Sequence, residues 1–224
     1  MLLAIDTATR MAGIALYDHE SGWVLGEETW YSVNNHTVEL MPRLVHLLEQ
    51  QGFSPAELNG LAVSLGPGSF TGLRIGLGVA KGLALARKLP LVGIPTLDVV
   101  AQPHMAQQLP IWALLEAGRG RFCAGQYACR SGQWYQRGAY QLTTVDELCD
   151  QIKEPALICG EVRDPDREMI HQKLGKTVTI ASPAASMRRA GYLAELAWQR
   201  LARGDTDDAA TLSPIYLNNP QLSP

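Results

Sequence analysis

The chain has 224 residues, of which 46% are hydrophobic and 18% are charged, a composition ordinary for a soluble globular protein with one domain or two small ones. The formal net charge of −3 argues against a main role in gripping nucleic acid, so any RNA partner requires a more basic companion chain. No run of about 20 apolar residues is present to cross a membrane. Because Asp6 and Arg10 also interrupt the apolar N-terminus, we expect a cytoplasmic protein with no signal peptide.

Residues 1–104 show the succession of apolar runs and turns that is typical of one mixed α/β lobe. The predicted elements are, in chain order, strands at 2–5, 13–17 and 23–30, a helix at 37–51, a strand at 61–65, a helix at 73–88, a strand at 91–94 and a helix from 96. The strand at 61–65 is a short apolar run bounded by glycines, as expected for a strand buried on both faces. The parallel pairings that this order implies need right-handed crossovers.

Residues 105–224 repeat this order in reduced form, without detectable repetition of the sequence itself. The predicted elements are strands at 111–115, 122–129 and 134–142, a helix at 145–152, a strand at 156–159, a helix at 166–174, a strand at 178–180 and a final helix at 183–203. We therefore expect two lobes, 1–104 and 105–224, and the sequence leaves open whether the final helix packs back on the first lobe. The acidic run after this helix is expected to be a solvated loop: Asp205, Asp207 and Asp208.

The stretch around which the first lobe is organised is Gly66-Pro67-Gly68-Ser69-Phe70-Thr71-Gly72-Leu73-Arg74-Ile75-Gly76, where a strand ends and a long helix begins. A strand, a glycine turn and a helix N-terminus together aim backbone N–H groups at one point, which is how proteins hold anions and phosphates. The spacing nevertheless matches neither a Walker A loop, nor the Gly-x-Gly-x-x-Gly fingerprint, nor the Gly-x-Ser-x-Gly elbow of serine hydrolases. A tight turn before an ordinary helix is the alternative interpretation.

Four glycines lie inside the predicted helix at 73–88 or at its start, namely Gly72, Gly76, Gly78 and Gly82. Each glycine in a helix interior costs about 0.8–1 kcal/mol relative to alanine. Glycine at such positions allows another backbone to approach closely. Because these glycines fall on more than one side of the helix, we infer close neighbours on more than one side, one of which could be another protein chain. The alternative is that all four pack against the sheet of the same lobe.

The first turn, Asp6-Thr7-Ala8-Thr9, joins two predicted strands. A β-meander that opens in this way is similar to the start of the lobes of actin, Hsp70 and the sugar kinases, in which the first turn meets the ATP phosphates and its aspartate serves Mg²⁺. A strand-end aspartate is also a common turn former, and that alternative stays open. No metal site is predicted, because none of the histidines has the spacing of a zinc or iron site: His19, His36, His46, His104 and His171.

Several segments carry a family resemblance: Leu3-Ala4-Ile5-Asp6-Thr7-Ala8-Thr9, the run at 66–76, Ala80-Lys81-Gly82-Leu83-Ala84, Gly93-Ile94-Pro95-Thr96-Leu97 and Pro214-Ile215-Tyr216-Leu217. In them the chain resembles the bacterial TsaB family, also called YeaZ. The resemblance implies the actin-like ATPase fold, an α/β fold of two ribonuclease-H-like lobes, of which the second is reduced in this chain. It also implies a subunit of the machinery that makes threonylcarbamoyladenosine beside the anticodon of tRNAs that read codons beginning with A.

TsaB proteins do not carry the chemistry; they pair with the catalytic paralogue TsaD, and the ATPase TsaE joins that complex. The resemblance therefore implies a scaffold subunit that is not an enzyme and has no cofactor of its own, with ATP, Mg²⁺ and a metal on the partner subunits and with tRNA met only through the complex. In the family the long helices of the first lobe form the dimer interface, which agrees with the glycines. The predicted partner interface is Gly72, Arg74, Gly76, Val79, Lys81 and Leu83.

A second hypothesis treats the chain as an enzyme, either an ATPase, a sugar-type kinase or a peptidase, that grips nucleotide at its first turn and glycine turn. Under the scaffold hypothesis the same residues are vestigial phosphate contacts, and no catalytic residue is predicted. The candidate nucleotide contacts are Asp6, Thr7, Gly66, Gly68 and Ser69. ATP affinity and turnover of the isolated chain separate the two hypotheses. A third hypothesis is a homodimer through the glycine-rich helix when the partner is absent, since related lobes share a surface.

Overall fold

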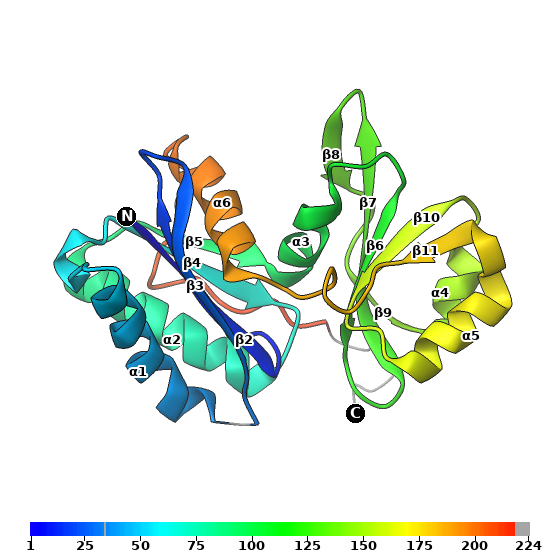
Figure 1. Ribbon diagram of the computed structural model, residues 1–224, viewed down its shortest axis with the longest axis horizontal. Coiled ribbons are helices and arrows are strands. Elements are labelled where there is room, and N and C mark those ends of the chain that lie inside the picture. Colours follow the sequence, from blue (N-terminus) through cyan, green and yellow to red (C-terminus); the bar gives the residue numbers. More distant parts are fainter. Residues whose placement is uncertain (34, 218–224) are drawn as a thin grey trace. The chain divides into compact units, whose positions relative to one another are not determined.

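The computed structural model describes residues 1–33 and 35–217, which form two compact units (Figure 1). The first unit consists of Met1–Val99 and Arg188–Ile215, and the second consists of Val100–Met187 with residues 216 and 217. The chain thus leaves the first unit after Val99, returns to it at Arg188 and leaves it again after Ile215. The division expected from the sequence lay after residue 104 and left open where the last helix packs. Among the described residues, no helix combines the length and the apolar character that crossing a membrane requires.

The first unit is built on a five-stranded mixed sheet with the strand order β3-β2-β1-β4-β5. Strands β1 to β3 form an antiparallel meander, and β4 and β5 are added in parallel beyond β1. The elements are β1 (Leu2–Asp6), β2 (Met11–Asp18), β3 (Trp23–Tyr31), α1 (His36–Gln50), η1 (Pro55–Glu57), β4 (Gly60–Gly66), α2 (Phe70–Arg87), β5 (Leu91–Pro95), α6 (Ala190–Leu201) and α3 (Thr96–Ala101), whose last two residues already belong to the second unit. The predicted order of strands and helices up to β5 is confirmed.

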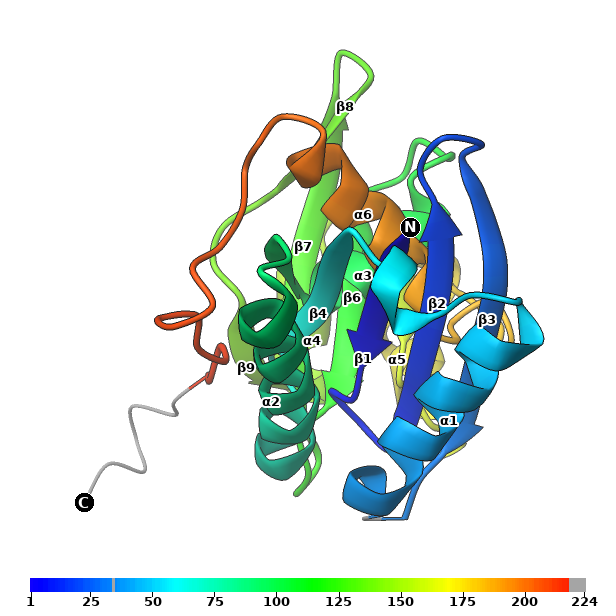
Figure 2. The same ribbon diagram turned by 90° about the vertical axis from the view of Figure 1, so that its left-hand side faces the viewer.

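Helices cover both faces of this sheet, α1 and α2 one face and α6 the other (Figure 2). The central strand β1 serves both, because successive side chains of a strand point to opposite faces. Leu3 and Ile5 join the core under α1 and α2, whereas Leu2 and Ala4 join the core under α6. This explains why β1 reads as a continuous apolar run, and it places the end of β1 in the interior of the unit.

The second unit repeats this plan with the strand order β11-β10-β6-β7-β8, and β9 pairs with β7. Its elements are η2 (Gln102–His104), β6 (Ile111–Glu116), β7 (Arg121–Arg130), β8 (Gln133–Gln136), β9 (Gln141–Thr144), α4 (Val145–Gln151), β10 (Ala156–Gly160), α5 (Asp164–Leu174), η3 (Gly175–Thr177) and β11 (Val178–Ile180). The single strand predicted at 134–142 is wrong. Gly138 adopts a φ of 79° between β8 and β9, which therefore pair with different parts of β7.

The last helix begins at Ala190 and not at residue 183 as predicted. Ser182 starts a single turn in which its carbonyl accepts from the backbone N–H of Ser186 and its hydroxyl accepts from that of Ala185. The chain then becomes extended, with φ −115° and ψ 134° at Arg189. Arg188 therefore leaves the helical path, and its side chain turns into the first unit.

The acidic segment after α6 is not simply the solvated loop that was expected. The backbone N–H of Asp207 donates to the carbonyl of Leu91, and its carboxylate accepts from the backbone N–H of Gly93 at 2.8 Å. Asp207 also forms an ion pair with Arg200 of α6, as does Asp205. This segment therefore attaches to the edge strand β5, where unpaired backbone groups would otherwise remain.

Candidate functional site

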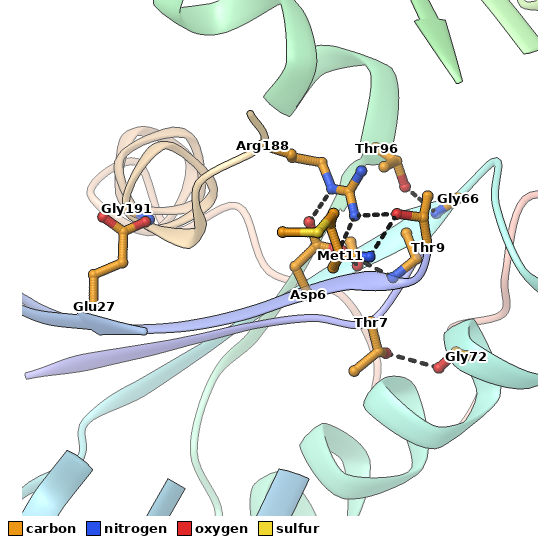
Figure 3. A network of polar contacts seen from close by, with 12 residues as sticks. Asp6, Thr7, Thr9, Met11, Glu27, Gly66, Gly72, Thr96, Arg188 and Gly191 are labelled. Carbon is orange, nitrogen blue, oxygen red and sulfur yellow. Dashed lines mark hydrogen bonds and ion pairs between the residues drawn. The ribbon is translucent and has the colours of Figure 1, made fainter. Parts of the chain in front are cut away.

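The carboxylate of Asp6, at the end of β1, is held by three donors of its own chain (Figure 3). One carboxylate oxygen accepts from the backbone N–H of Ala8 at 2.9 Å and from the hydroxyl of Ser64 at 2.8 Å. The other oxygen accepts from Nε of Arg188. The side chains of Asp6 and Arg188 are each only 3% exposed, so this is a buried ion pair.

The guanidinium of Arg188 also holds the turn that follows Asp6. Its Nη2 donates to the hydroxyl of Thr9 at 3.0 Å and to the carbonyl of Met11 at 2.7 Å. A buried ion pair is stable only where further hydrogen bonds satisfy the remaining donors and acceptors, and here they do so on both partners. The consequence is a turn from β1 to β2 that is fixed by a residue far away in the sequence.

The same turn interlocks with the start of α2. The side chain of Ser69 caps this helix, since it accepts from the backbone N–H of Gly72 at 3.2 Å, and the backbone N–H of Ser69 donates to the carbonyl of Ala8 at 2.6 Å. The hydroxyl of Thr7 donates to the carbonyl of Gly72 at 2.7 Å. Helix α2 accordingly begins at Phe70, three residues earlier than predicted.

This interlock explains three glycines of the motif. A Cβ placed on Gly68, Gly72 or Gly76 would lie 2.3, 2.2 and 2.2 Å, respectively, from the Ala8 carbonyl oxygen, the Thr7 carbonyl oxygen and the Thr7 hydroxyl oxygen. Real Cβ atoms essentially never come so close to another heavy atom. The close neighbour inferred for this side of the helix is therefore the chain's own first turn.

Gly72 and Gly76, which the sequence analysis placed at a partner interface, are both buried inside the first unit. Val79 and Leu83 are half-buried against the core under α1 and α2. Lys81 donates to two backbone carbonyls of the C-terminal segment, those of residues 210 and 212, at 3.2 and 2.8 Å. Of the six predicted residues, Arg74 is the exposed one, and its guanidinium carbon lies 3.7 Å from the centroid of the Phe70 ring.

The solvent-facing side of the helical layer is formed by Arg74 together with residues of α1 and α2 that were not predicted, and we call it the α1/α2 face. Both helices cover the same face of the sheet, so both of their exposed stripes point away from it (Figure 2). The members of the α1/α2 face are Val38, Met41 and Val45 on α1, and Phe70, Arg74, Gly78, Gly82 and Leu85 on α2.

The α1/α2 face is unusually apolar for exposed helix positions. Val38 is 70% exposed, Leu85 is 65% exposed and Phe70 is 54% exposed. A Cβ on Gly78 or Gly82 would meet nothing within 4 Å, so no contact inside the described chain accounts for either glycine. The α1 residues were missed in the sequence, although the spacing of Val38, Met41 and Val45 opposite the leucine stripe was a readable signal.

The predicted phosphate contacts lie together at the first turn and the glycine turn, and two of their backbone donors are engaged within the chain. Asp6, Thr7 and Gly66 are buried, whereas Gly68 and Ser69 are exposed. The backbone N–H of Gly66 donates to the hydroxyl of Thr96 at 3.0 Å, and that of Ser69 donates to Ala8. In this arrangement neither of these two N–H groups is available to a phosphate.

The described residues offer little support for a metal site or for a cysteine nucleophile. No group of three or more histidine, cysteine or acidic side chains lies close enough in this part of the chain to hold a metal ion. All four cysteines are free, and burial raises the pKa of Cys123 to about 11 and that of Cys159 to about 12. These two thiols therefore stay protonated at neutral pH, which is unfavourable for a nucleophile.

Two mixed sheets with the same strand order define the class of protein, the actin-like ATPase fold. A protein-family model described as "TsaD: tRNA N6-adenosine threonylcarbamoyltransferase" matches residues 30–221. Within this class the chain belongs to the TsaB/YeaZ family of tRNA threonylcarbamoyladenosine biosynthesis proteins. The resemblance seen in the sequence motifs is confirmed.

Three relatives illustrate the match. The TsaB protein of Bacillus subtilis (strain 168) is 31% identical over 219 residues, covering 96% of this chain and 93% of the relative. That of Escherichia coli (strain K12) is 27% identical over 231 residues, covering 97% and 94%. The solved structure of YeaZ from Pseudomonas aeruginosa superimposes with a TM-score of 0.79 at 25% identity, covering 96% of this chain and 99% of that one.

Proposed function

We propose that this chain is a non-catalytic subunit of threonylcarbamoyladenosine biosynthesis that binds a TsaD protein and stabilises it for threonylcarbamoyl transfer to the adenosine beside the tRNA anticodon. Family membership supports the pathway. The observation that carries the partner-binding role is the α1/α2 face, which is apolar and exposed and contains two glycines without a neighbour. Exposed apolar patches of this kind mark protein interaction sites.

The glycines of the α1/α2 face support a helical partner. Each interior glycine costs α2 about 0.8–1 kcal/mol, and for Gly78 and Gly82 no contact within the described chain explains that cost. Glycines at a spacing of four residues lie on one side of a helix and allow a second helix to cross at short range. The flanking side chains of Val38, Met41 and Leu85 would then be removed from water by the same partner.

The catalytic machinery belongs, in this proposal, to the partners. The chain has no cofactor of its own, TsaE joins through the complex, ATP, Mg²⁺ and a metal are held by the partner subunits, and tRNA is met only through the complex in the cytoplasm. The same α1/α2 face supports pairing of two copies when TsaD is absent. In support, the strand-end carboxylate Asp6 is engaged by Arg188. The competing proposal is an ATP-binding enzyme that uses Asp6 and the glycine turn.

The test is co-purification with the TsaD of the same organism, followed by a threonylcarbamoyl transfer assay. Met41→Asp places a charge on the α1/α2 face, and the matched control is Met169→Asp, because Met169 lies on α5 of the second unit and is 41% exposed against 39% for Met41. We expect wild type and Met169→Asp to bind TsaD and support transfer, and Met41→Asp to lose binding. If wild type fails to bind TsaD, or if Met41→Asp binds as well as Met169→Asp, this proposal fails.

The enzyme alternative is tested on the isolated chain. ATP turnover above the level of contaminants, abolished by Asp6→Asn, would favour that alternative over a scaffold. Under the scaffold proposal the purified wild-type chain does not hydrolyse ATP, and wild type and Asp6→Asn give the same result.

A further inference from the structure

The first turn of an actin-like lobe is the place where the fold implies a Mg²⁺-nucleotide, so the residues here can be tested for their fit to that group. Mg²⁺ demands a nearly octahedral set of oxygen ligands at about 2.0–2.1 Å. Both oxygens of the Asp6 carboxylate already accept hydrogen bonds, one from Ala8 and Ser64 and the other from Arg188. With its side chain 3% exposed, the carboxylate presents no open side to a hydrated cation. The residues do not fit a metal ion.

Charge leads to the same conclusion. Asp6 and Arg188 form a buried ion pair, to which neutral groups also bond: the hydroxyls of Thr9 and Ser64 and the carbonyl of Met11. A divalent cation at Asp6 would lie against a buried guanidinium, where like charges repel strongly because water does not screen them. Two of the backbone donors that a phosphate could use here, the N–H groups of Gly66 and Ser69, also donate within the chain.

We propose that Arg188 is a built-in counter-cation that occupies the cation-binding side of Asp6, so that the first unit binds neither Mg²⁺ nor a Mg²⁺-nucleotide at its strand-end turn. The guanidinium supplies the positive charge that the buried carboxylate requires. This inference concerns the isolated chain and does not depend on the partner proposed above.

The same residue acts as a positioning residue for the first unit. Arg188 is where the chain returns to this unit, and α6 begins two residues later at Ala190. Through Asp6 and Thr9 it fixes the turn between β1 and β2, and through Thr7 that turn holds the carbonyl of Gly72 in α2. One ion pair therefore links the elements on the two opposite faces of the sheet (Figure 3).

The binding experiment uses Mn²⁺ as a paramagnetic substitute for Mg²⁺, detected by water proton relaxation, and MgATP, detected by titration calorimetry. It compares the full wild-type chain with Asp6→Asn. The expected result is that neither probe shows a site that depends on Asp6. Binding of Mn²⁺ or MgATP by wild type that is lost in Asp6→Asn would overturn the proposal.

The positioning role is tested by urea unfolding of Arg188→Met, Asp6→Asn and the double variant. Each single change leaves the other member of the buried ion pair without its partner, so both single variants are expected to have a lower unfolding midpoint than wild type. The double variant is expected to lose less stability than the sum of the two single losses. Arg189→Met is the matched control, because this neighbouring arginine pairs with Glu27 while its own side chain is 52% exposed. Strictly additive losses, or equal losses for Arg188→Met and Arg189→Met, would contradict the proposal.

If Arg188→Met does not fold, Arg188→Lys replaces it in the comparison of unfolding midpoints. Lysine preserves the charge but lacks the planar fork that reaches Asp6, Thr9 and Met11 together. We expect it to fold with an unfolding midpoint between those of wild type and Asp6→Asn, and to leave Mn²⁺ binding unchanged. A midpoint equal to that of wild type would show that the charge alone suffices and would refute the positioning role.

Discussion

Replacement of both Gly78 and Gly82 with alanine is expected to stabilise the isolated chain. Alanine is favoured over glycine inside a helix by about 0.8–1 kcal/mol per position, so the pair should gain about 1.6–2 kcal/mol. Nothing lies within 4 Å of the added methyl groups, so no steric penalty offsets this gain. Urea unfolding followed by circular dichroism measures the change in stability.

Gly76→Ala is the matched control on the opposite side of the same helix. Its Cβ would lie 2.2 Å from the hydroxyl oxygen of Thr7, so the first turn or the helix must shift. Overpacking of this kind costs about 1–3 kcal/mol. This cost offsets or exceeds the gain in helix propensity, which is about 1 kcal/mol. We therefore expect the control to be destabilised by up to about 2 kcal/mol while the Gly78 and Gly82 variant is stabilised.

The functional half of this prediction uses leucine at the same two positions. Gly78→Leu with Gly82→Leu should keep or raise the stability of the isolated chain and should weaken binding to TsaD by at least about tenfold, a free-energy change of about 1.4 kcal/mol. Higher stability together with weaker binding identifies the glycines as interface residues. If the alanine pair destabilises the chain, an internal neighbour has been overlooked, and if the leucine pair binds TsaD normally, the α1/α2 face is not the interface.

Three further predictions concern particular side chains. Burial raises the pKa of Glu195, against a smaller opposing effect of Arg189. The folded state therefore binds this proton more tightly than the unfolded state, and the stability of the protein falls as pH rises from the ordinary pKa of 4.5 through the raised pKa. Glu195→Gln should remove this part of the fall, which is measured from unfolding midpoints below and above that pH range. Lys81→Met should cost about 1.5 kcal/mol through its lost bonds to the C-terminal segment and speed proteolysis there, whereas unchanged proteolysis would show that the segment is held by other contacts. Cys123 and Cys159, with pKa values raised to about 11 and about 12, should react with a thiol reagent only after unfolding, and fast labelling of the native chain at either site would contradict their burial.

The sheets could be predicted from the sequence because their information is local. Apolar runs such as β1 and β4 are bounded by glycine or by a strand-end aspartate, and their order alone implies the parallel pairings. The start of α6 could not be predicted, because the residue that interrupts the helical pattern, Arg188, does so to reach Asp6 across 182 positions of sequence. No local pattern carries that information.

The proposed partner surface shows a different limit. Sequence reasoning recognised that the glycines of α2 need close neighbours but could not tell internal neighbours from external ones. Gly76 and Gly78 are two positions apart, and the helical turn between them places Gly76 against Thr7 and Gly78 toward solvent. Gly72 and Gly76 were assigned to the interface for this reason, and only the packing of the first turn, which buries both glycines, distinguishes the two sides of the helix.

The order in which the chain is made has a consequence for the first unit. Its sheet begins with β1, yet the helix that covers one face and the segment that attaches to β5 come from Arg188–Ile215, after the whole of Val100–Met187. During synthesis, at about 5–20 residues per second, Leu2, Ala4 and the carboxylate of Asp6 must wait for several seconds or longer before their partners exist. The sheet of the second unit, which is encoded without interruption within Val100–Met187, can form by then. The part of the chain that is translated first is therefore among the last to be finished.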